Sequence, residues 1–159
     1  NVAASVGVLI SDDDGNFLFE KRAKEPKKGL LTQPGGFIDA DESAEKAVER
    51  ECMEELGAKV EDIRYIGSYP NTYEYKNISY KTCDMFFTAR IKGCNSLKDF
   101  AKELSEKRQK SEVEEIIIRK ISGPDDIEKL PLAFISTKNV LKDFFGGEDF
   151  SQGDELLWI

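Results

Sequence analysis

The sequence predicts an α/β domain, and three observations support this prediction. Runs rich in β-branched and aromatic residues, such as residues 2–10 and 78–91, alternate with longer segments of helical periodicity. One of these segments, residues 43–56, has a good helix start and a good helix stop. The length of 159 residues, 40% of them hydrophobic, is enough for one domain with a full core.

The N-terminal part of the chain is predicted to form a hairpin followed by a glycine-rich loop. Two strands, residues 2–10 and 17–21, are joined by a polar turn at residues 12–16. The Pro-Gly-Gly sequence at residues 34–36 predicts a loop, because only glycine lets the backbone approach a ligand closely at positive φ. Carbonyl oxygens in this loop are therefore candidate ligands for a hard cation.

The remaining elements follow the same alternation. Further strands are expected at residues 60–68, 78–91 and 113–121, and helices at residues 43–56, 97–110 and 137–145. Residues 146–153 have a linker-like composition and lead to an apolar end. We therefore expect a domain over residues 1–145 and a tail over residues 146–159 that either docks on the domain or binds a partner.

The helix at residues 43–56 carries acidic side chains where its periodicity requires apolar ones. With about 100° per residue, its apolar residues form a single inward stripe. Glu51 and Glu55 fall inside that stripe, and Glu54 lies at its edge. A buried carboxylate without a partner is costly, so it protonates, pairs with a cation or binds a metal. The pattern favours a metal site over a solvated acidic face.

The neighbours of these carboxylates indicate how they are held. Ser43 is a good N-cap and Gly57 a good C-cap, so the helix is bounded at both ends. Arg50 is adjacent to Glu54 on the helical wheel and can form a bidentate pair with a carboxylate such as Glu42. We expect this pair to keep the acidic cluster in place.

Composition narrows the chemistry. The chain contains no histidine, which excludes Ser-His-Asp triads, Cys-His pairs and histidine-ligated zinc. A hard, oxygen-ligated ion, Mg²⁺ or Mn²⁺, is the natural occupant of a glutamate cluster. The net charge of −8 argues against a nucleic-acid groove, since basic patches mark phosphate-backbone binding. No apolar run is long enough for a membrane span, and we expect a cytoplasmic protein.

The residues around the acidic helix resemble the signature of the Nudix hydrolases. That signature reads Gly-X5-Glu-X7-Arg-Glu-aliphatic-X-Glu-Glu-X-Gly-aliphatic, and every spacing is kept here, with the fixed members at Gly36, Glu42, Arg50, Glu51, Glu54, Glu55 and Gly57. Cys52 and Ala58 occupy the aliphatic places, and Asp41 replaces the glycine that commonly precedes the first glutamate. The resemblance implies the Nudix fold, a mixed β-sheet sandwiched between α-helices.

The resemblance also implies a reaction: hydrolysis of a nucleoside diphosphate linked to another moiety, by attack of water at phosphorus. The metal ligands would be Gly36, Glu51, Glu54 and Glu55, and Glu54, Glu55 and Arg50 would carry the catalysis. Bound Mg²⁺ or Mn²⁺ would neutralise the phosphate oxygens and lower the pKa of a bound water.

A further carboxylate from outside the helix often completes such a metal site or acts as the base. Glu112 is our candidate, because it opens an acidic run just before a predicted strand, as a comparable glutamate does in the NADH pyrophosphatase branch of the family. Glu114 and Glu115 are alternatives, and so is a purely surface role for all three.

The expected substrate class rests on a short sequence resemblance and on the arginine and aromatic residues around the loop. The Gly-Gly-Phe-Ile-Asp sequence that starts at Gly35 resembles the NADH and ADP-ribose pyrophosphatase branch. Arg22 is expected to meet a phosphate, and Phe37 and Tyr73 to stack on a base. The other tyrosines of the expected loop at residues 69–80 are alternatives for stacking.

Three function classes stay open at this point. The preferred class acts on NADH, ADP-ribose or a similar diphosphate. The second is a nucleoside triphosphate pyrophosphohydrolase that removes oxidised nucleotides, and the third is a sensor that binds a nucleotide without cleaving it. The expected partner is a small nucleotide, with no nucleic acid and no membrane, and the assembly is open between a monomer and a homodimer.

Overall fold

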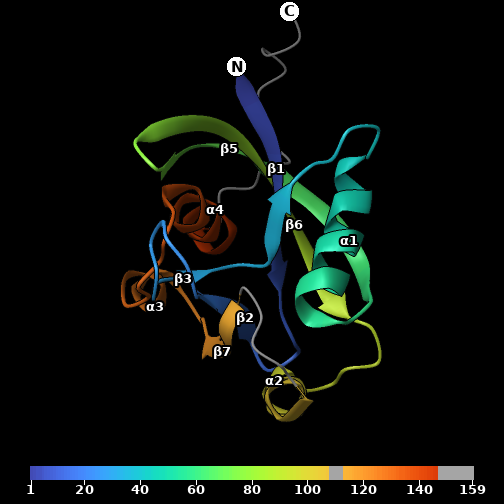
Figure 1. The fold of residues 1–159 in the computed structure, drawn as a ribbon. Coiled ribbons are helices and arrows are strands. Elements are labelled where there is room, and N and C mark those ends of the chain that lie inside the picture. Colours follow the sequence, from blue (N-terminus) through green and yellow to red (C-terminus); the bar gives the residue numbers. More distant parts are fainter. Residues whose placement is uncertain (108–112, 147–159) are drawn as a thin grey trace, which may run out of the picture.

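The computed structural model describes residues 1–107 and 113–146, and it places them in two sheets between helices (Figure 1). The first sheet has four strands in the order β4-β1-β6-β5, and the second has three in the order β3-β2-β7. The strands are β1 (Val2–Ile10), β2 (Asn16–Arg22), β3 (Leu31–Thr32), β4 (Gly35–Phe37), β5 (Val60–Tyr75), β6 (Ile78–Ile91) and β7 (Val113–Lys120). Because β1 is parallel to β6 and antiparallel to β4, the predicted mixed sheet is confirmed.

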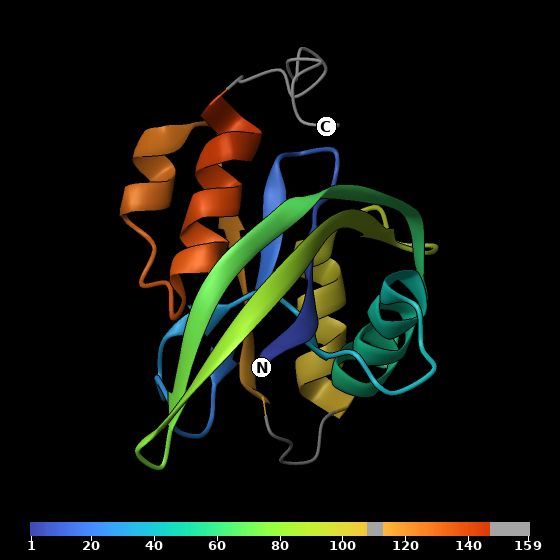
Figure 2. The same cartoon turned by 90° about the horizontal axis from the view of Figure 1, so that it is seen from above.

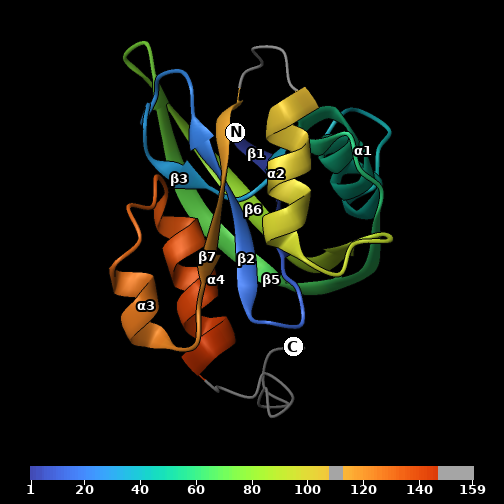
Figure 3. The same ribbon diagram turned by 90° about the horizontal axis from the view of Figure 1, so that it is seen from below.

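In the described residues, four helices cover the two sheets: α1 (Ala44–Leu56), α2 (Leu97–Lys107), α3 (Pro124–Glu128) and α4 (Ile135–Gly146). Figures 2 and 3 show α1 and α2 on one side of the sheets, and α3 and α4 on the other. Within the described ranges, no helix is long and apolar enough to cross a membrane. The predicted layering, with sheet between helices, is therefore correct.

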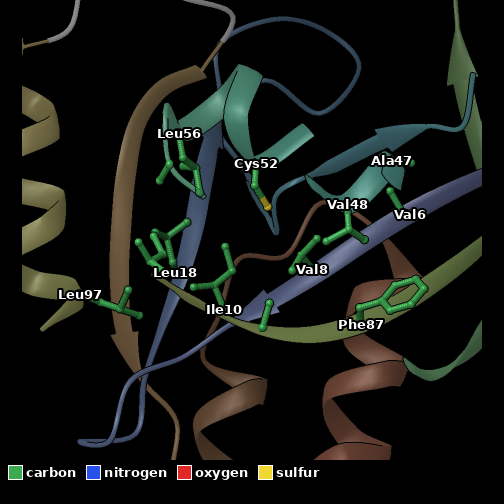
Figure 4. Close-up of a cluster of buried hydrophobic side chains, with 13 residues drawn as sticks. Val6, Val8, Ile10, Leu18, Ala47, Val48, Cys52, Leu56, Phe87 and Leu97 are labelled. Carbon is green, nitrogen blue, oxygen red and sulfur yellow. The ribbon is translucent and has the colours of Figure 1, made fainter. Parts of the chain in front are cut away.

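Each side of the sheets has its own core, because successive strand residues point to opposite faces. Val8 and Ile10 of β1 and Leu18 of β2 pack with the buried face of α1, which Figure 4 shows in close-up. Leu9 of β1 and Phe19 of β2 pack instead with α3 and α4. The central strands are thus buried on both faces and hold α1 in a fixed position.

The expected N-terminal hairpin is only partly correct. The polar turn is present, with Asp12 accepting hydrogen bonds from the backbone and side-chain nitrogens of Asn16 at 3.1 Å. The strands on either side of it separate, however, and meet only at a bridge between Ser11 and Phe17. The reason is that β4 and β6 take both edges of β1, while β3 and β7 take both edges of β2.

The expected loop at residues 69–80 is wrong, because β5 continues to Tyr75 and forms a hairpin with β6. The chain reverses at Lys76 and Asn77, whose φ values of 50° and 62° suit a tight hairpin turn. Pro70 lies within β5, and β5 is an edge strand, where proline is tolerated.

The remaining differences are short elements and element ends. The Pro-Gly-Gly segment enters a strand, β4, rather than a loop, and β3 and α3 were not predicted. The helix expected at residues 137–145 begins earlier, as α4. Residues 108–112, where the helix expected at residues 97–110 would end, and residues 147–159 of the expected tail lie outside the described residues.

Candidate active site

The local sequence fixes where α1 begins and ends. Ser43 is the N-cap, and its Oγ accepts a hydrogen bond from the backbone nitrogen of Lys46 at 3.2 Å. Gly57 ends the helix in the left-handed conformation, with φ of 64°. Both caps are as predicted. The helix therefore presents one face to the sheet, with Ala47, Val48, Cys52 and Leu56 buried on it.

Arg50 organises the acidic side chains of this region. Its Nε donates to Glu42 Oε1 at 2.8 Å and its Nη2 to Glu42 Oε2 at 3.0 Å, which is the bidentate pair that we predicted. Its Nη1 donates to Glu51 Oε1 at 2.9 Å and to Glu54 Oε2 at 3.3 Å. The hydrogen bond from Arg50 lowers the pKa of Glu42, and Glu42 in turn raises the pKa of Arg50. Arg50 is thus ionised and donates hydrogen bonds to three carboxylates.

The strand β4 lies directly against these carboxylates. The Gly35 nitrogen donates to Glu55 Oε1 at 3.4 Å, and a Cβ atom on Gly36 would collide with the Glu51 carboxylate. A Cβ atom on Gly35 would collide with the Val6 carbonyl of β1. The absence of a side chain therefore lets β4 approach β1 closely at Gly35 and α1 closely at Gly36.

Glu55 is the most perturbed acid of the group. Burial raises its pKa, and contacts with the carboxylates of Glu20 and Glu51 raise it further. Cys52 lies beside the same group, and burial together with Glu55, Glu20 and Glu51 raises its thiol pKa to about 12. The local environment thus disfavours negative charge here, and a cation bound among the carboxylates would reverse that cost.

Glu54 differs from the other two box glutamates. Its side chain is 59% exposed, against 12% for Glu51, and it turns toward Arg50. In this arrangement no three acidic or thiol side chains of the described part of the chain are grouped so that they could hold a metal ion. Glu54 nevertheless lines the same cavity as Glu51 and Glu55. The donors themselves fit a hard cation, since they are all oxygen atoms.

A cavity of about 680 Å³ opens in front of the carboxylates and brings the predicted substrate-binding residues together. It is lined by Glu51, Glu54 and Glu55, and also by Arg22, Phe37 and Tyr73. Phe37 is 48% exposed and its ring lies 6.3 Å from that of Tyr73, at an edge-on angle of 78°. The cavity thus combines carboxylates with aromatic rings.

Arg22 is fixed at the same cavity by aromatic contacts. Its guanidinium carbon lies 5.2 Å from the ring centre of Phe134 and 5.9 Å from that of Tyr73. Its Nε donates to the Pro26 carbonyl at 2.7 Å, and its Nη2 to the Tyr73 hydroxyl at 3.4 Å. The cation is thereby oriented before any ligand binds.

Comparison with known proteins decides the family. The NUDIX domain family matches residues 2–143, which is most of the chain. This chain belongs to the Nudix family. The signature over residues 36–58, which we call the Nudix box, is thus part of a complete domain, and the predicted family and fold are confirmed.

Individual relatives cover the Nudix chain to different extents. The NAD-capped RNA hydrolase NudC of Haemophilus influenzae is 42% identical over 50 residues, which is 31% of this chain and 19% of that protein. The chain therefore matches only about a fifth of that relative's length.

Solved structures match the Nudix chain over most of its length. A NUDIX hydrolase from Nitrosomonas europaea has a TM-score of 0.69 at 17% identity, covering 92% of this chain and 90% of that one. The NUDIX domain of Shewanella oneidensis NrtR, solved with ADP ribose, has a TM-score of 0.64 at 21% identity, covering 91% and 87%. At these identities the likeness shows the fold alone.

Glu115 and Tyr69, both predicted as alternatives, do not line this Nudix cavity. Glu112 and the side chain of Glu114 lie outside the described residues, while Glu115 is exposed and forms an ion pair with Lys21 at 3.1 Å. Tyr69, an alternative for stacking, donates instead to Asp143 at 2.8 Å and packs against Phe86 in the core. The predicted metal and substrate residues otherwise line one cavity.

Sequence reasoning missed two groups of polar residues in this Nudix cavity. Asp84 of β6 accepts hydrogen bonds from Ser5 at 2.5 Å and from Ser136 at 2.6 Å. Glu20 of β2 is buried and also lines the cavity. The strand periodicity contained a signal for Glu20, since it follows three buried apolar residues of β2.

Proposed function

We propose that this Nudix domain is a Mg²⁺-dependent hydrolase that cleaves a nucleoside diphosphate linked to another moiety, such as ADP-ribose or NADH. One observation carries the proposal. The cavity that contains the box carboxylates Glu51 and Glu55 also contains an oriented arginine, Arg22, and two aromatic rings, Phe37 and Tyr73. A nucleotide needs both: cationic groups for its phosphates and ring faces for its base.

The metal would be held by the Gly36 carbonyl and by Glu51, Glu54 and Glu55. When bound, it would neutralise phosphate oxygens and lower the pKa of a coordinated water. The chain prepares the site in two ways. Gly36 leaves room for the Glu51 carboxylate, and Arg50 positions Glu51 and Glu54 by hydrogen bonds. Glu112 stays our candidate for the base.

The residues on the substrate side would fix the diphosphate and the base. Arg22 would meet a phosphate with its oriented guanidinium, and Phe37 would stack on a base because its ring is half exposed at the cavity wall. Tyr73 supports both groups, since it contacts the Phe37 ring and accepts a hydrogen bond from Arg22.

Two of the similar proteins support a dinucleotide-like substrate. One is named as an NAD-capped RNA hydrolase, and the other was solved with ADP ribose. Both ligands contain an adenosine diphosphate group. The RNA part is not carried over, because the match covers only 19% of the hydrolase and this chain has a net charge of −8. The absence of a nucleic-acid partner stays a prediction.

A substrate panel tests the proposal. ADP-ribose, NADH and nucleoside triphosphates are incubated with Mg²⁺ or with a chelator, and the released phosphates are measured. Hydrolysis should appear with Mg²⁺ and vanish with the chelator, and Glu55→Gln should lower kcat by orders of magnitude while the fold is kept. Glu49→Gln is the matched control, because Glu49 is on the outer face of α1 and pairs with Lys46.

Each alternative predicts a different result in this panel. A triphosphate pyrophosphohydrolase would release inorganic pyrophosphate and leave ADP-ribose and NADH intact. A nucleotide sensor would bind ADP-ribose, as seen by calorimetry, without any product. Full activity in the presence of the chelator would contradict the metal mechanism itself.

A further inference from the structure

Glu20 lies on β2 at a position whose neighbours on the same face of the sheet are apolar. Residues on one face of a strand are two apart, so Glu20 points to the same side as Leu18, which packs in the core under α1. Its cross-strand partner on β7 is Ile116, which packs against that same core. Glu20 is nevertheless only 4% exposed. The sheet thus repeats the feature that marked α1, a carboxylate in an apolar position.

The carboxylate of Glu20 meets those of the helix. It lies within hydrogen-bonding reach of the carboxyl group of Glu55. Oε1 of Glu20 and Oε2 of Glu55 are both shielded from solvent. Glu51 contacts Glu55 as well. Glu20 and Glu51 therefore each lie beside Glu55 at the wall of the cavity, although the three are not grouped closely enough to hold a metal ion as they stand.

We propose that Glu20 is a fourth carboxylate of the metal site, supplied by the sheet rather than by the Nudix box. This inference rests on the proposed function, because it assigns Glu20 to the metal of that reaction. Its physical basis is charge: several carboxylates that share a poorly hydrated space repel one another unless a cation lies among them. Arg50 supplies one cation, which donates to Glu51 and Glu54.

The position of Glu20 has a mechanical consequence. Glu51, Glu54 and Glu55 belong to α1 and Gly36 belongs to β4 of the first sheet, so a metal held by these four residues alone would leave the second sheet untouched. A metal that also binds Glu20 links α1 to β2, the central strand of the second sheet. Metal binding should therefore raise the melting temperature, and part of that gain should depend on Glu20.

The alternative is that Glu20 is purely structural and hydrogen-bonds Glu55 without touching the metal. The two roles predict opposite effects in the metal-free protein. Glu20→Gln keeps the volume and removes one charge, so a metal ligand should give a variant that is as stable as the parent, or more stable, without metal. A structural partner of Glu55 should give a variant with a lower melting temperature.

The test is a Mn²⁺ titration followed by electron paramagnetic resonance, with the melting temperature measured with and without Mn²⁺. Glu20→Gln should lower the Mn²⁺ affinity by about 10- to 100-fold, the range found for residues that support a metal site. It should also shrink the metal-induced rise in melting temperature, and Glu20→Asp should recover part of the affinity because it keeps the charge. Glu49→Gln is the control and should behave like the parent.

The outcomes separate this inference from the proposed function. If the parent binds no Mn²⁺, the metal-dependent function is wrong. If the parent binds Mn²⁺, and Glu20→Gln and Glu20→Asp bind it with unchanged affinity, Glu20 is structural and only this inference is overturned. If Glu20→Gln does not fold, the comparison of Glu20→Asp with the parent decides. A Glu20→Asp variant with unchanged Mn²⁺ affinity and a lower melting temperature in the absence of metal would again contradict the metal role.

Discussion

Arg50 contacts several carboxylates at once, unlike an arginine in a simple surface ion pair. It donates to Glu42 through two nitrogens and to Glu51 and Glu54 through the third. Its Nη2 also donates to the Phe37 carbonyl at 3.0 Å, just beyond the two glycines of β4. One planar guanidinium thus ties α1 to β4 and sets the positions of the candidate metal ligands, a task that a lysine ammonium cannot perform.

Replacing this arginine gives a prediction at the scale of one residue. Arg50→Lys keeps the charge but loses the bidentate fork, so kcat should fall by roughly 10- to 100-fold while KM changes little. Steady-state kinetics on the preferred substrate measure both constants. A loss confined to KM would place Arg50 in contact with substrate instead.

The thiol of Cys52 gives a second prediction. The residue is fully buried, and burial together with the neighbouring carboxylates raises its pKa to about 12. Since the thiolate is the reactive form, Cys52 should resist iodoacetamide in the folded protein and react only in denaturant. Mass spectrometry of the labelled peptides gives the result. Labelling of native Cys52 at the rate of the partly exposed Cys83 would contradict this account.

Among the elements, α1 could be predicted and its surroundings could not. Its caps and its apolar stripe are local signals, and so is the misplacement of Glu51 and Glu55 within the stripe. The strand β4 has only three residues and exists because β1 offers it an edge. The contact of Glu20 with Glu55 likewise depends on how α1 lies on β2. Both are products of tertiary packing, which periodicity does not report.

Substitutions at the two adjacent glycines of β4 should affect different properties, stability at Gly35 and metal binding at Gly36. Gly35→Ala would drive a methyl group into the Val6 carbonyl, so we expect a loss of roughly 1–3 kcal/mol in the free energy of unfolding. Gly36→Ala would meet the Glu51 carboxylate, which can move, so its main effect should be weaker Mn²⁺ binding. Chemical denaturation and Mn²⁺ titration of both variants test this. Equal effects of the two variants on both measurements would contradict the assignment.

Asp12 connects the turn before β2 to the start of α2. Its Oδ2 accepts a hydrogen bond from the Leu97 nitrogen at 3.0 Å. Burial raises its pKa, but hydrogen bonds from Leu97, Asn16 and Asp14 outweigh that effect, so the pKa lies below its usual value of 3.8. Asp12 therefore stabilises the fold above that value, and its contribution is lost as the pH falls through the lower, folded-state pKa.

The corresponding variant tests this sign. Asp12→Asn should lower the free energy of unfolding near neutral pH by about 1 kcal/mol, because charge-assisted hydrogen bonds become neutral ones. The difference from the parent should shrink as the pH falls below about 4, where the unfolded carboxyl group protonates. Thermal melts over this range measure the difference. A gap that widens on acidification would contradict the sign.

At the scale of the whole molecule, the two hydrophobic cores hold the two walls of the candidate active site in place: the carboxylates of α1 on one wall and the aromatic residues on the other. The box carboxylates come from α1, which packs on the core formed with Val8 and Leu18. Tyr73 comes from the long β5–β6 hairpin, and Phe134 from the segment before α4, which packs on the opposite core. The class of fold could be predicted from local sequence, and so could the carboxylates of α1 that line the cavity, but the assembly of the cavity from both sides could not.

The central claim is metal-dependent hydrolysis within a diphosphate bridge, and product analysis tests it most directly. ADP-ribose is incubated with the protein and Mg²⁺ in ¹⁸O-labelled water, and the products are identified by mass spectrometry. The account predicts AMP and a sugar monophosphate, with one labelled oxygen in one of them, and no product in the presence of a chelator. Release of inorganic pyrophosphate from a nucleoside triphosphate, with ADP-ribose and NADH untouched, would contradict it.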